Sequence, residues 1–244
     1  MNNKIKILRN KFKKYQIDGY IVPKNDEFFT EYSKINRLET ISNFTGSAGL
    51  AVILKDRNYL FTDGRYTIQS QIECGKNFKI IDSQKLTNCS LFKNVTLGVD
   101  PRLFTNNQIN KFFKKNNKIK LIDNNLVDEI KSKKNIKPAP FFSLEKNIVG
   151  ESHNSKIDKI SKFLKKEKCD YLFISGPENV AWTLNIRGSD SPNSPIPNAR
   201  LIISKDKKIY FIGKIQNIKK IIKEKKIKLE KFIDVDNFKE KLIK

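Results

Sequence analysis

The chain contains a sequence pattern that occurs twice. Its first copy, residues 42–47 (SNFTGS), precedes two apolar runs joined by a Lys-Asp turn in residues 51–62. The second copy, residues 184–189 (LNIRGS), precedes the same arrangement in residues 201–212. Aligned without a gap, the two apolar hairpins lie 150 residues apart. A period of this length is far too long for a solenoid repeat and indicates two related globular domains in tandem.

A second pair of segments supports the duplication. Residues 8–22 resemble residues 160–174, because each contains a lysine-rich amphipathic segment that leads through an aspartate into a short apolar run. The offset between these two segments is 152 residues. In a chain of 244 residues, each half is long enough to bury a hydrophobic core of its own.

Size and cysteine usage restrict the class of protein. No stretch approaches the roughly 18 consecutive apolar residues of a membrane span, and the N-terminus lacks the apolar core of a secretory signal. The three cysteines, Cys74, Cys89 and Cys169, show no CxxC spacing. We therefore expect buried or semi-buried filler cysteines rather than a disulfide framework or a zinc site. Together these features predict a cytoplasmic protein without a membrane partner.

The formal net charge of +23 raises the question of nucleic-acid binding. Only seven of the 49 basic residues are arginine, however, and phosphate and base recognition favour the arginine fork. The lysines are spread over the whole chain together with many Asn and Ile residues, which indicates a coding bias. A charge run such as residues 219–226 is then a solvated helix face. The sequence argues against a nucleic-acid partner.

The first half of the chain shows strands that alternate with helices. Apolar residues at helical spacing predict helices, and short apolar runs bounded by turn residues predict strands. The expected elements are a helix over 4–15, a strand over 19–22, a hairpin over 51–62, a helix over 63–74, strands over 78–81 and 97–100, a helix over 106–115 and a strand over 119–122. Alternation of this kind predicts an α/β fold, and the hairpin makes its sheet mixed.

The second half repeats this order after a lysine- and proline-containing stretch without a sustained period. The expected elements are a helix over 155–168, a strand over 171–175, a helix over 178–184, a hairpin over 201–212, a helix over 214–225, a strand over 231–235 and a helix from 237. We therefore expect a first domain over 1–131, a linker over 132–152 and a second domain over 153–244. The sequence reaches Lys244 within a helical pattern that has no terminating residue, so we expect the second domain to be incomplete at its C-terminus.

Two pairs of charged residues are candidates for a substrate cleft or a domain contact. Asp63 and Arg65 follow the first hairpin, where Asp63 either caps a helix or joins Arg65 in contacting another domain or subunit. Arg187 and Asp190 lie on a loop that also contains Pro192, Pro195 and Pro197. Two interpretations of that loop remain open: Arg187 presents a fixed cation to a peptide carboxylate or an acidic rim, or it forms an internal ion pair with Asp190.

No residues of the chain predict a catalytic or metal site. His153 is the only histidine, and it has no cluster of ligand-type residues around it, so we read it as a helix-start residue. The sequence contains no GxSxG, GxxxxGK or GxGxxG motif. The short run of residues 46–49 (GSAG) stands before a strand, where we expect a bend that permits close packing.

Seven segments, taken in order, carry a family resemblance: residues 18–23 (DGYIVP), 31–32 (EY), 37–49, 61–66 (FTDGRY), 97–101 (LGVDP), 126–130 (LVDEI) and 181–190 (AWTLNIRGSD). They resemble the N-terminal half of a cytosolic, three-domain Xaa-Pro aminopeptidase (aminopeptidase P) of the creatinase/prolidase superfamily. The resemblance implies two creatinase-N-like domains, each a mixed sheet flanked by helices. The chain departs from the family pattern at Lys131, where the family has an aromatic residue.

The family's third domain, with the pita-bread fold, carries the chemistry. It holds two divalent metal ions, commonly manganese, bound by two Asp, one His and two Glu, which activate a hydroxide against the bond that precedes proline. None of these ligands can be assigned to a residue of this sequence, so the resemblance implies no catalytic residue and no bound metal in this chain. It implies a scaffold that shapes the cleft, takes part in homo-oligomer contacts and brings Arg187 and Asp190 to the substrate side.

Two hypotheses about function follow. In the first, the chain is the non-catalytic N-terminal portion of a metal-dependent Xaa-Pro aminopeptidase, which acts on proline-containing peptides through a domain that these residues do not include. In the second, the two domains form a stand-alone binding or assembly module without enzymatic activity.

Overall fold

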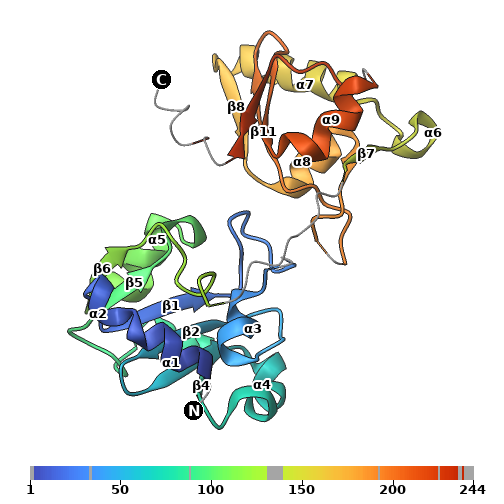
Figure 1. The fold of residues 1–244 in the computed structure, drawn as a ribbon. Helices are drawn as coiled ribbons and strands as arrows, with labels where there is room; N and C mark the ends of the chain where they lie inside the picture. The colour runs from blue at the N-terminus through green and yellow to red at the C-terminus, as the bar shows by residue number, and fades with distance from the viewer. Residues whose placement is uncertain are drawn as a thin grey trace. The chain divides into compact units, whose positions relative to one another are not determined.

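The computed structural model describes residues 3–32, 35–87, 89–130, 140–191, 193–224, 226–235 and 238. The chain forms two compact units, Met1–Asn135 and Ile136–Lys244, and each has its own sheet and its own helices (Figure 1). Both sheets are mixed and flanked by helices, which confirms the predicted α/β class.

Within the described residues, the first unit contains a six-stranded sheet in the order β4-β3-β2-β1-β5-β6. The strands are β1 Gly19–Pro23, β2 Leu50–Leu54, β3 Asn58–Thr62, β4 Lys79–Asp82, β5 Thr96–Val99 and β6 Lys118–Leu121. β1, β2 and β3 pair antiparallel, while β4 is parallel to β3 and β5 is parallel to both β1 and β6. Parallel pairs need long crossover connections, which the helices provide.

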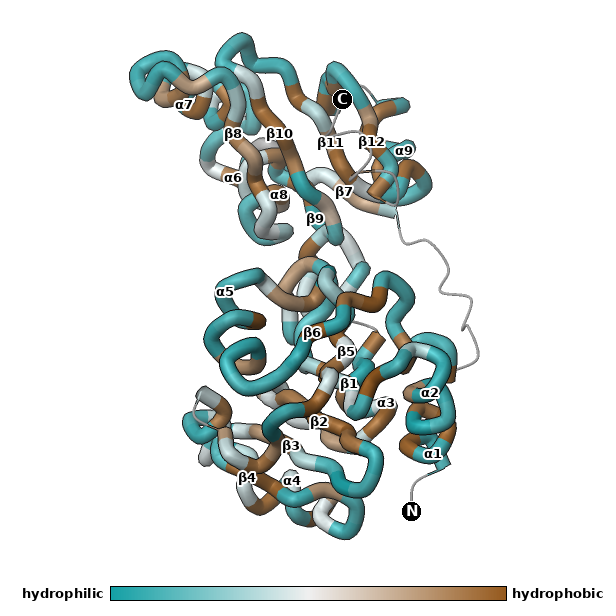
Figure 2. Tube along the Cα trace, turned by 90° about the vertical axis from the view of Figure 1, so that its left-hand side faces the viewer, coloured by the Kyte–Doolittle hydropathy of each residue, from teal (hydrophilic) through white to brown (hydrophobic). Residues whose placement is uncertain are grey.

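Side chains that alternate along the strands enter two hydrophobic cores, one on each face of this sheet. In the first core, Tyr20 packs with Ile5 of the N-terminal helix. In the second core, Ile21 and Val52 pack with Phe113. Figure 2 shows the hydrophobic stretch along β2 that results. The helices and turns that cover these faces are α1 Asn3–Asn10, α2 Phe12–Tyr15, α3 Arg37–Ser42, η1 Gly64–Tyr66, α4 Thr67–Cys74, η2 Ser83–Leu86, η3 Pro101–Leu103, α5 Asn106–Ile109 and η4 Asn110–Lys114.

The second unit repeats the first part of this architecture. Its sheet has the order β12-β11-β10-β8 among the described residues, and a short pair, β7-β9, lies apart from it. A third core forms between one face of the sheet and three helices, with Ile157, Val180 and Ile218 contributed by the helices and Phe211 by the sheet. The elements are β7 Phe142–Ser143, α6 Lys146–Val149, α7 His153–Lys166, β8 Tyr171–Ile174, α8 Pro177–Leu184, β9 Ile186–Arg187, β10 Arg200–Ser204, β11 Ile209–Gly213, α9 Ile215–Lys223 and β12 Lys231–Asp234.

The hairpin turn is one residue longer in the second unit, so the ungapped alignment of the hairpins is wrong for their second strand. Ala51 pairs with Leu60 in the first sheet, and Leu201 pairs with Phe211 in the second. The offset is therefore 150 residues for β2 and β10 (201 − 51) but 151 for β3 and β11 (211 − 60). A slip by one residue would turn every side chain of β11 to the other face. The longer turn keeps Phe211 in the core, as Leu60 is.

Two predicted helices are less regular than expected. The helix predicted over 4–15 is split at Lys11 into α1 and α2, and α2 ends at Gln16 with a left-handed conformation (φ 48°). The helix predicted over 106–115 continues from α5 into a single π turn, η4, which places Phe113 in the second core. Neither break has a proline or glycine that would have revealed it in the sequence.

Part of the predicted linker contributes to the second unit. Residues 140–152 contain β7 and α6, and Phe141 is fully buried in the third core. Ser152 caps α7, because its hydroxyl accepts a hydrogen bond from the amide of Ser155, and His153 begins the helix as expected. Residues 131–139 and most of the helix predicted from 237 lie outside the described residues. The exact domain bounds of 131 and 153 stay a prediction.

The three cysteines are free thiols. Cys74 and Cys89 are buried as predicted, and burial raises the pKa of Cys74 to about 11. Cys169 is exposed, so the expectation of a buried or semi-buried filler is wrong at that position. No helix within the described residues combines the length and the apolar character that a membrane crossing requires.

Candidate functional site

The end of α8 in the second unit is held by a buried lysine. Lys156 is only 3% exposed, and its Nζ donates to the Trp182 carbonyl at 2.7 Å and to Asn185 Oδ1 at 2.6 Å. The ammonium also lies 4.2 Å from the centroid of the Trp182 ring, a cation–π distance. Asn185 adopts a left-handed conformation (φ 54°) that ends the helix, and burial lowers the pKa of Lys156. This arrangement fixes the point at which the candidate loop begins.

Arg187 and Asp190 do not form the internal ion pair that was one of the two interpretations of this loop. Arg187 Nη1 donates to the carbonyls of Ala181 (3.3 Å) and Ile186 (2.9 Å), and among the described residues Arg187 makes no salt bridge. Asp190 instead accepts hydrogen bonds from the Asn198 amide at 2.7 Å and, in addition, from Asn217 Nδ2 at 3.2 Å. The carboxylate of Asp190 therefore closes the loop, and the guanidinium charge of Arg187 is left for another partner.

Gly188 explains why the loop can pass so close to the rest of the unit. A Cβ atom at this position would lie 2.8 Å from the Cα of Pro197 and 3.0 Å from the ring of Phe141. The amide of Gly188 also donates to the Pro195 carbonyl at 3.0 Å. Only a residue without a side chain fits between these groups. Gly188 therefore determines where the backbone of the preceding residue, Arg187, lies.

Asp63 caps the helix that follows it, as one of the two interpretations predicted, while contact of Asp63 and Arg65 with another domain or subunit stays a prediction. Asp63 Oδ1 accepts from the Arg65 amide at 3.1 Å and caps η1. The Arg65 guanidinium returns to the same carboxylate with contacts of 2.9 and 2.8 Å, and it lies 5.1 Å from the Tyr66 ring centroid. Arg65 is exposed and Asp63 is partly exposed, and the two side chains pair with each other. The pair belongs to the first unit, whereas Arg187 and Asp190 belong to the second.

A buried charge network in the first unit was not predicted from the sequence. Arg37, on α3, is 4% exposed and donates to both carboxylate oxygens of Asp128 (2.8 and 2.7 Å) and to Glu27 (2.6 Å). Burial alone lowers the pKa of Arg37, but the hydrogen bonds to Asp128 and Glu27 outweigh it, so the net pKa is raised. Arg37 and Asp128 are 91 positions apart in the sequence, so no local pattern could have predicted that they pair. The role of the network is to tie α3 to the segment that follows β6.

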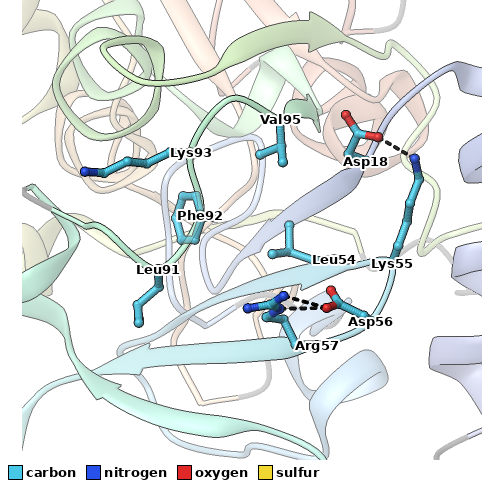
Figure 3. Close-up of a pocket in the computed structure, with 9 residues that line it drawn as sticks. All are labelled: Asp18, Leu54, Lys55, Asp56, Arg57, Leu91, Phe92, Lys93 and Val95. Carbon is cyan, nitrogen blue, oxygen red and sulfur yellow. Dashed lines mark hydrogen bonds and ion pairs between the residues drawn. The ribbon is translucent and has the colours of Figure 1, made fainter.

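A shallow pocket of about 260 Å³ lies beside the first hairpin turn. Four of its charged side chains form two pairs: Lys55 contacts Asp18, and Arg57 contacts Asp56 at 2.7 Å (Figure 3). The hydrogen bond from Lys55 lowers the pKa of Asp18. Asp18 precedes β1, so the pocket lies at the amino ends of the parallel strands, whereas open α/β sheets bind ligands at the carboxyl ends. We read it as a packing hollow.

No group of three or more His, Cys, Asp or Glu within the described residues is placed to hold a metal ion. His153 has a lowered pKa, first because it is partly buried and second because Lys156 is close. The lowered pKa favours the neutral imidazole, but His153 belongs to no group of three or more possible ligands among the described residues. The part of the chain that the structure describes therefore offers no cluster that fits a dinuclear metal site.

Comparison with known proteins finds a family match for each of the two units. A family model described as the creatinase/prolidase N-terminal domain matches residues 4–130, and a second model with the same description matches residues 136–244. The probable Xaa-Pro aminopeptidase P of Laccaria bicolor is 32% identical over 226 residues. The Xaa-Pro aminopeptidase 1 of Dictyostelium discoideum is 31% identical over 236 residues. These matches cover 86% and 87% of this chain.

The chain spans only 35% and 38% of the length of these two relatives. Among solved structures, the X-prolyl aminopeptidase of Caenorhabditis elegans, described as a cytosolic enzyme with a di-nuclear active site, superimposes with a TM-score of 0.84 at 24% identity. It covers 96% of this chain, which covers 42% of that protein. The two consecutive domain matches agree with the duplication of β1–β4 in β8–β12. The chain belongs to the creatinase/prolidase N-terminal domain family, with one copy of the domain in each unit.

Proposed function

We propose that this chain is the non-catalytic N-terminal portion of a metal-dependent Xaa-Pro aminopeptidase, a hydrolase that removes the N-terminal residue preceding proline. One observation carries the proposal: relatives with that activity in their names match almost the whole chain, yet the chain spans little more than a third of their length. The two domains then act as a scaffold for an active site carried elsewhere in the enzyme.

Within this scaffold, the loop of Arg187 is the part proposed to face the substrate. Its guanidinium makes no salt bridge among the described residues, while Asp190 and Gly188 hold the backbone in place. A rigid loop with an uncompensated cation suits the carboxylate of a peptide or an acidic rim of the cleft. Asp63 and Arg65 neutralise each other, so we assign them a structural role.

The remaining features of the proposal lie outside these residues. The two divalent ions, proposed to be manganese, would supply an activated hydroxide, and no group of three or more possible ligands occurs among the described residues. The cytoplasm is the proposed location, and a homo-oligomer is the proposed state of the complete enzyme.

A peptidase assay tests the proposal. The purified 244-residue chain is incubated with an Xaa-Pro peptide, with and without added Mn²⁺, and we expect no metal-dependent release of the N-terminal residue. A chimera in which this chain replaces the matched portion of the Dictyostelium relative is expected to cleave the same peptide. Metal-dependent cleavage by the isolated chain, or a folded chimera without activity, contradicts the proposal.

The chimera also tests the role of Arg187. We expect Arg187→Ala to raise KM by about tenfold, since a lost charge-assisted contact costs about 1.4 kcal/mol or more. Arg65→Ala is the matched control and is expected to leave KM unchanged. If the isolated chain binds proline-containing peptides tightly but the chimera is inactive, the stand-alone binding module becomes the better description.

A further inference from the structure

Two positively charged side chains meet at the C-terminal end of α8 in the second unit. Lys156 Nζ, from α7, donates to the Trp182 carbonyl at 2.7 Å. Arg187 Nη1, from β9, donates to the neighbouring Ala181 carbonyl at 3.3 Å. The last carbonyls of a helix lie at the negative end of its dipole and lack partners in a further turn. Each of the two cations therefore binds one of two adjacent acceptors.

The ammonium of Lys156 is enclosed at this corner. It also donates to Asn185 Oδ1 at 2.6 Å and lies 4.2 Å from the centroid of the Trp182 ring. With the Trp182 carbonyl, these contacts provide three partners for the three N–H groups of an ammonium. Burial lowers the pKa of Lys156; Glu151 opposes this shift, and the charge of Arg187 adds to it. The two cations thus lie close enough to act on each other.

The guanidinium of Arg187 is only partly used. Within the described residues its Nη1 atom alone donates hydrogen bonds, to the Ala181 carbonyl and, at 2.9 Å, to the Ile186 carbonyl. A guanidinium has five N–H groups in a planar fork, so those of Nε and Nη2 are left for an incoming acceptor. Because the side chain is partly exposed, this fork suits a carboxylate that arrives from solvent.

Removal of the Lys156 ammonium would leave two acceptors short of donors. The Trp182 carbonyl would keep only the Asn185 amide, at 3.4 Å, and Asn185 Oδ1 would lose its only donor among the described residues. Asn185 is 8% exposed, and a buried acceptor without a donor is costly. The Arg187 guanidinium already lies at the adjacent carbonyl. It would therefore turn toward these acceptors, and its remaining N–H groups would no longer face a ligand.

Lys156 also holds the backbone from which Arg187 projects. Asn185 has a left-handed conformation, with φ 54°. Its Nδ2 donates to the Glu151 carbonyl at 2.9 Å, and its own carbonyl accepts from the Leu144 amide at 3.1 Å. Arg187 follows two residues later in β9, which pairs with β7. The Asn185 side chain, which Lys156 binds, thus helps to set where β9 begins.

We propose that Lys156 is a positioning residue for Arg187. By occupying the acceptors of Trp182 and Asn185, the ammonium keeps the guanidinium turned outward, where it can bind a carboxylate. The inference rests on the proposed function for the substrate role of Arg187. The direction in which the guanidinium points, however, can be measured on the chain by itself.

The reactivity of Arg187 toward phenylglyoxal, a reagent that modifies accessible guanidinium groups, tests the proposal on the 244-residue chain. Peptide mass spectrometry measures the rate of modification in the unchanged chain and in Lys156→Met, which keeps a long side chain but removes the charge and the donors. We expect Arg187 to react at least about fivefold more slowly in Lys156→Met, an effect of the size of one net hydrogen bond. Arg65, in the first unit and 67% exposed, is the internal reference.

Lys159→Met is the matched control. Lys159 lies on the same helix, but its side chain is 70% exposed and pairs with Glu151, so the reactivity of Arg187 should not change. Circular dichroism establishes that each variant is folded. If Lys156→Met does not fold, Lys156→Gln replaces it, because its amide can donate to one of the two acceptors. Arg187 should then react at least about twofold more slowly than in the unchanged chain.

The chimera with the Dictyostelium relative separates this inference from the proposed function. Lys156→Met is expected to raise KM by about fivefold with kcat unchanged, the signature of lost binding alone. In the Arg187→Ala background it should add less than about twofold, since a residue that acts through Arg187 has nothing left to position.

Unchanged reactivity of Arg187 in a folded Lys156 variant, or full additivity of Lys156→Met and Arg187→Ala in KM, would overturn the proposal. An inactive chimera contradicts the proposed function instead, and the reactivity of Arg187 in the chain by itself then decides whether Lys156 positions it.

Discussion

At the scale of single residues, the Arg37 network makes the most definite prediction about stability. Arg37→Ala leaves Asp128 and Glu27 without their common partner, and breaking a buried ion pair is strongly destabilising. Because the side chains of Asp128 and Glu27 are 38% and 31% exposed, solvent offsets part of the loss, and we expect about 2–3 kcal/mol. Urea unfolding of the chain, followed by far-UV circular dichroism, measures this change in the transition that Trp182 fluorescence does not report.

Arg57→Ala is the matched control for Arg37→Ala. Arg57 pairs with Asp56, but the two side chains are 58% and 63% exposed, and exposed pairs contribute little. We expect no measurable change in the urea midpoint. Equal effects of the two substitutions would show that Arg37 does not tie α3 to the segment after β6.

His153 predicts a small pH dependence of stability in the second unit. Its partial burial and the charge of Lys156 lower its pKa in the folded state, while the unfolded value is about 6.5. The unfolded chain then takes up a proton at a higher pH than the folded chain does, so stability present above pH 6.5 is lost as the pH falls below it. We expect a loss of under about 1 kcal/mol between pH 7.5 and 5.5, since solvent screens the group.

Fluorescence of Trp182, the only tryptophan, follows the unfolding of the second unit. His153→Asn should remove the pH dependence between 7.5 and 5.5 without moving the midpoint at pH 7.5. An unchanged loss in His153→Asn would assign the effect to other groups. The single histidine was visible in the sequence, but the sign of its pKa shift required the burial that only the structure provides.

At the scale of elements, Gly188 determines how the candidate loop packs. Gly188→Ala places a methyl group 2.8 Å from the backbone of Pro197, which has no side-chain freedom to move away. Overpacking of this kind costs about 1–3 kcal/mol. We expect the urea midpoint of the Trp182 transition to fall accordingly. Gly64→Ala in the first unit, where an added Cβ meets nothing within 4 Å, is the control and should leave the far-UV circular dichroism transition of that unit nearly unchanged.

The elements also show where sequence reasoning succeeds and where it stops. The hairpins were predicted because apolar runs flank a Lys-Asp turn, yet the extra turn residue before β11 was not, since both alignments keep the Lys-Asp pair in register. The candidate loop was predicted from its prolines and its Arg-Gly sequence. The choice between an ion pair and a free guanidinium depended on Asn198 and Asn217, whose contacts with Asp190 no local pattern contains.

At the scale of the whole molecule, the duplication and the ordered motifs were sufficient to predict the family and the fold class. The exposure of Tyr171 and Phe173 on one face of the second sheet was not predictable in the same way. Tyr171 and Phe173 read as ordinary strand residues in the sequence, and their exposure becomes informative only when the strand register matches them to the buried positions of the first unit. The comparison of the two copies within one chain therefore shows that the exposure of Tyr171 and Phe173 is unusual, which a single domain could not show.

The separate cores predict that the two units unfold independently. Leu60 belongs only to the first core and Ile203 only to the third, so Leu60→Ala and Ile203→Ala each remove packing from one unit, at a cost of about 2–5 kcal/mol. The Trp182 signal reports the second unit, whereas far-UV circular dichroism reports both. We expect Ile203→Ala to lower the midpoint of the Trp182 transition and Leu60→Ala to leave it unchanged while shifting the remaining dichroism transition. If Leu60→Ala moved the Trp182 midpoint by a similar amount, the two domains would fold as one cooperative body, and a scaffold of independent family copies would no longer describe the chain.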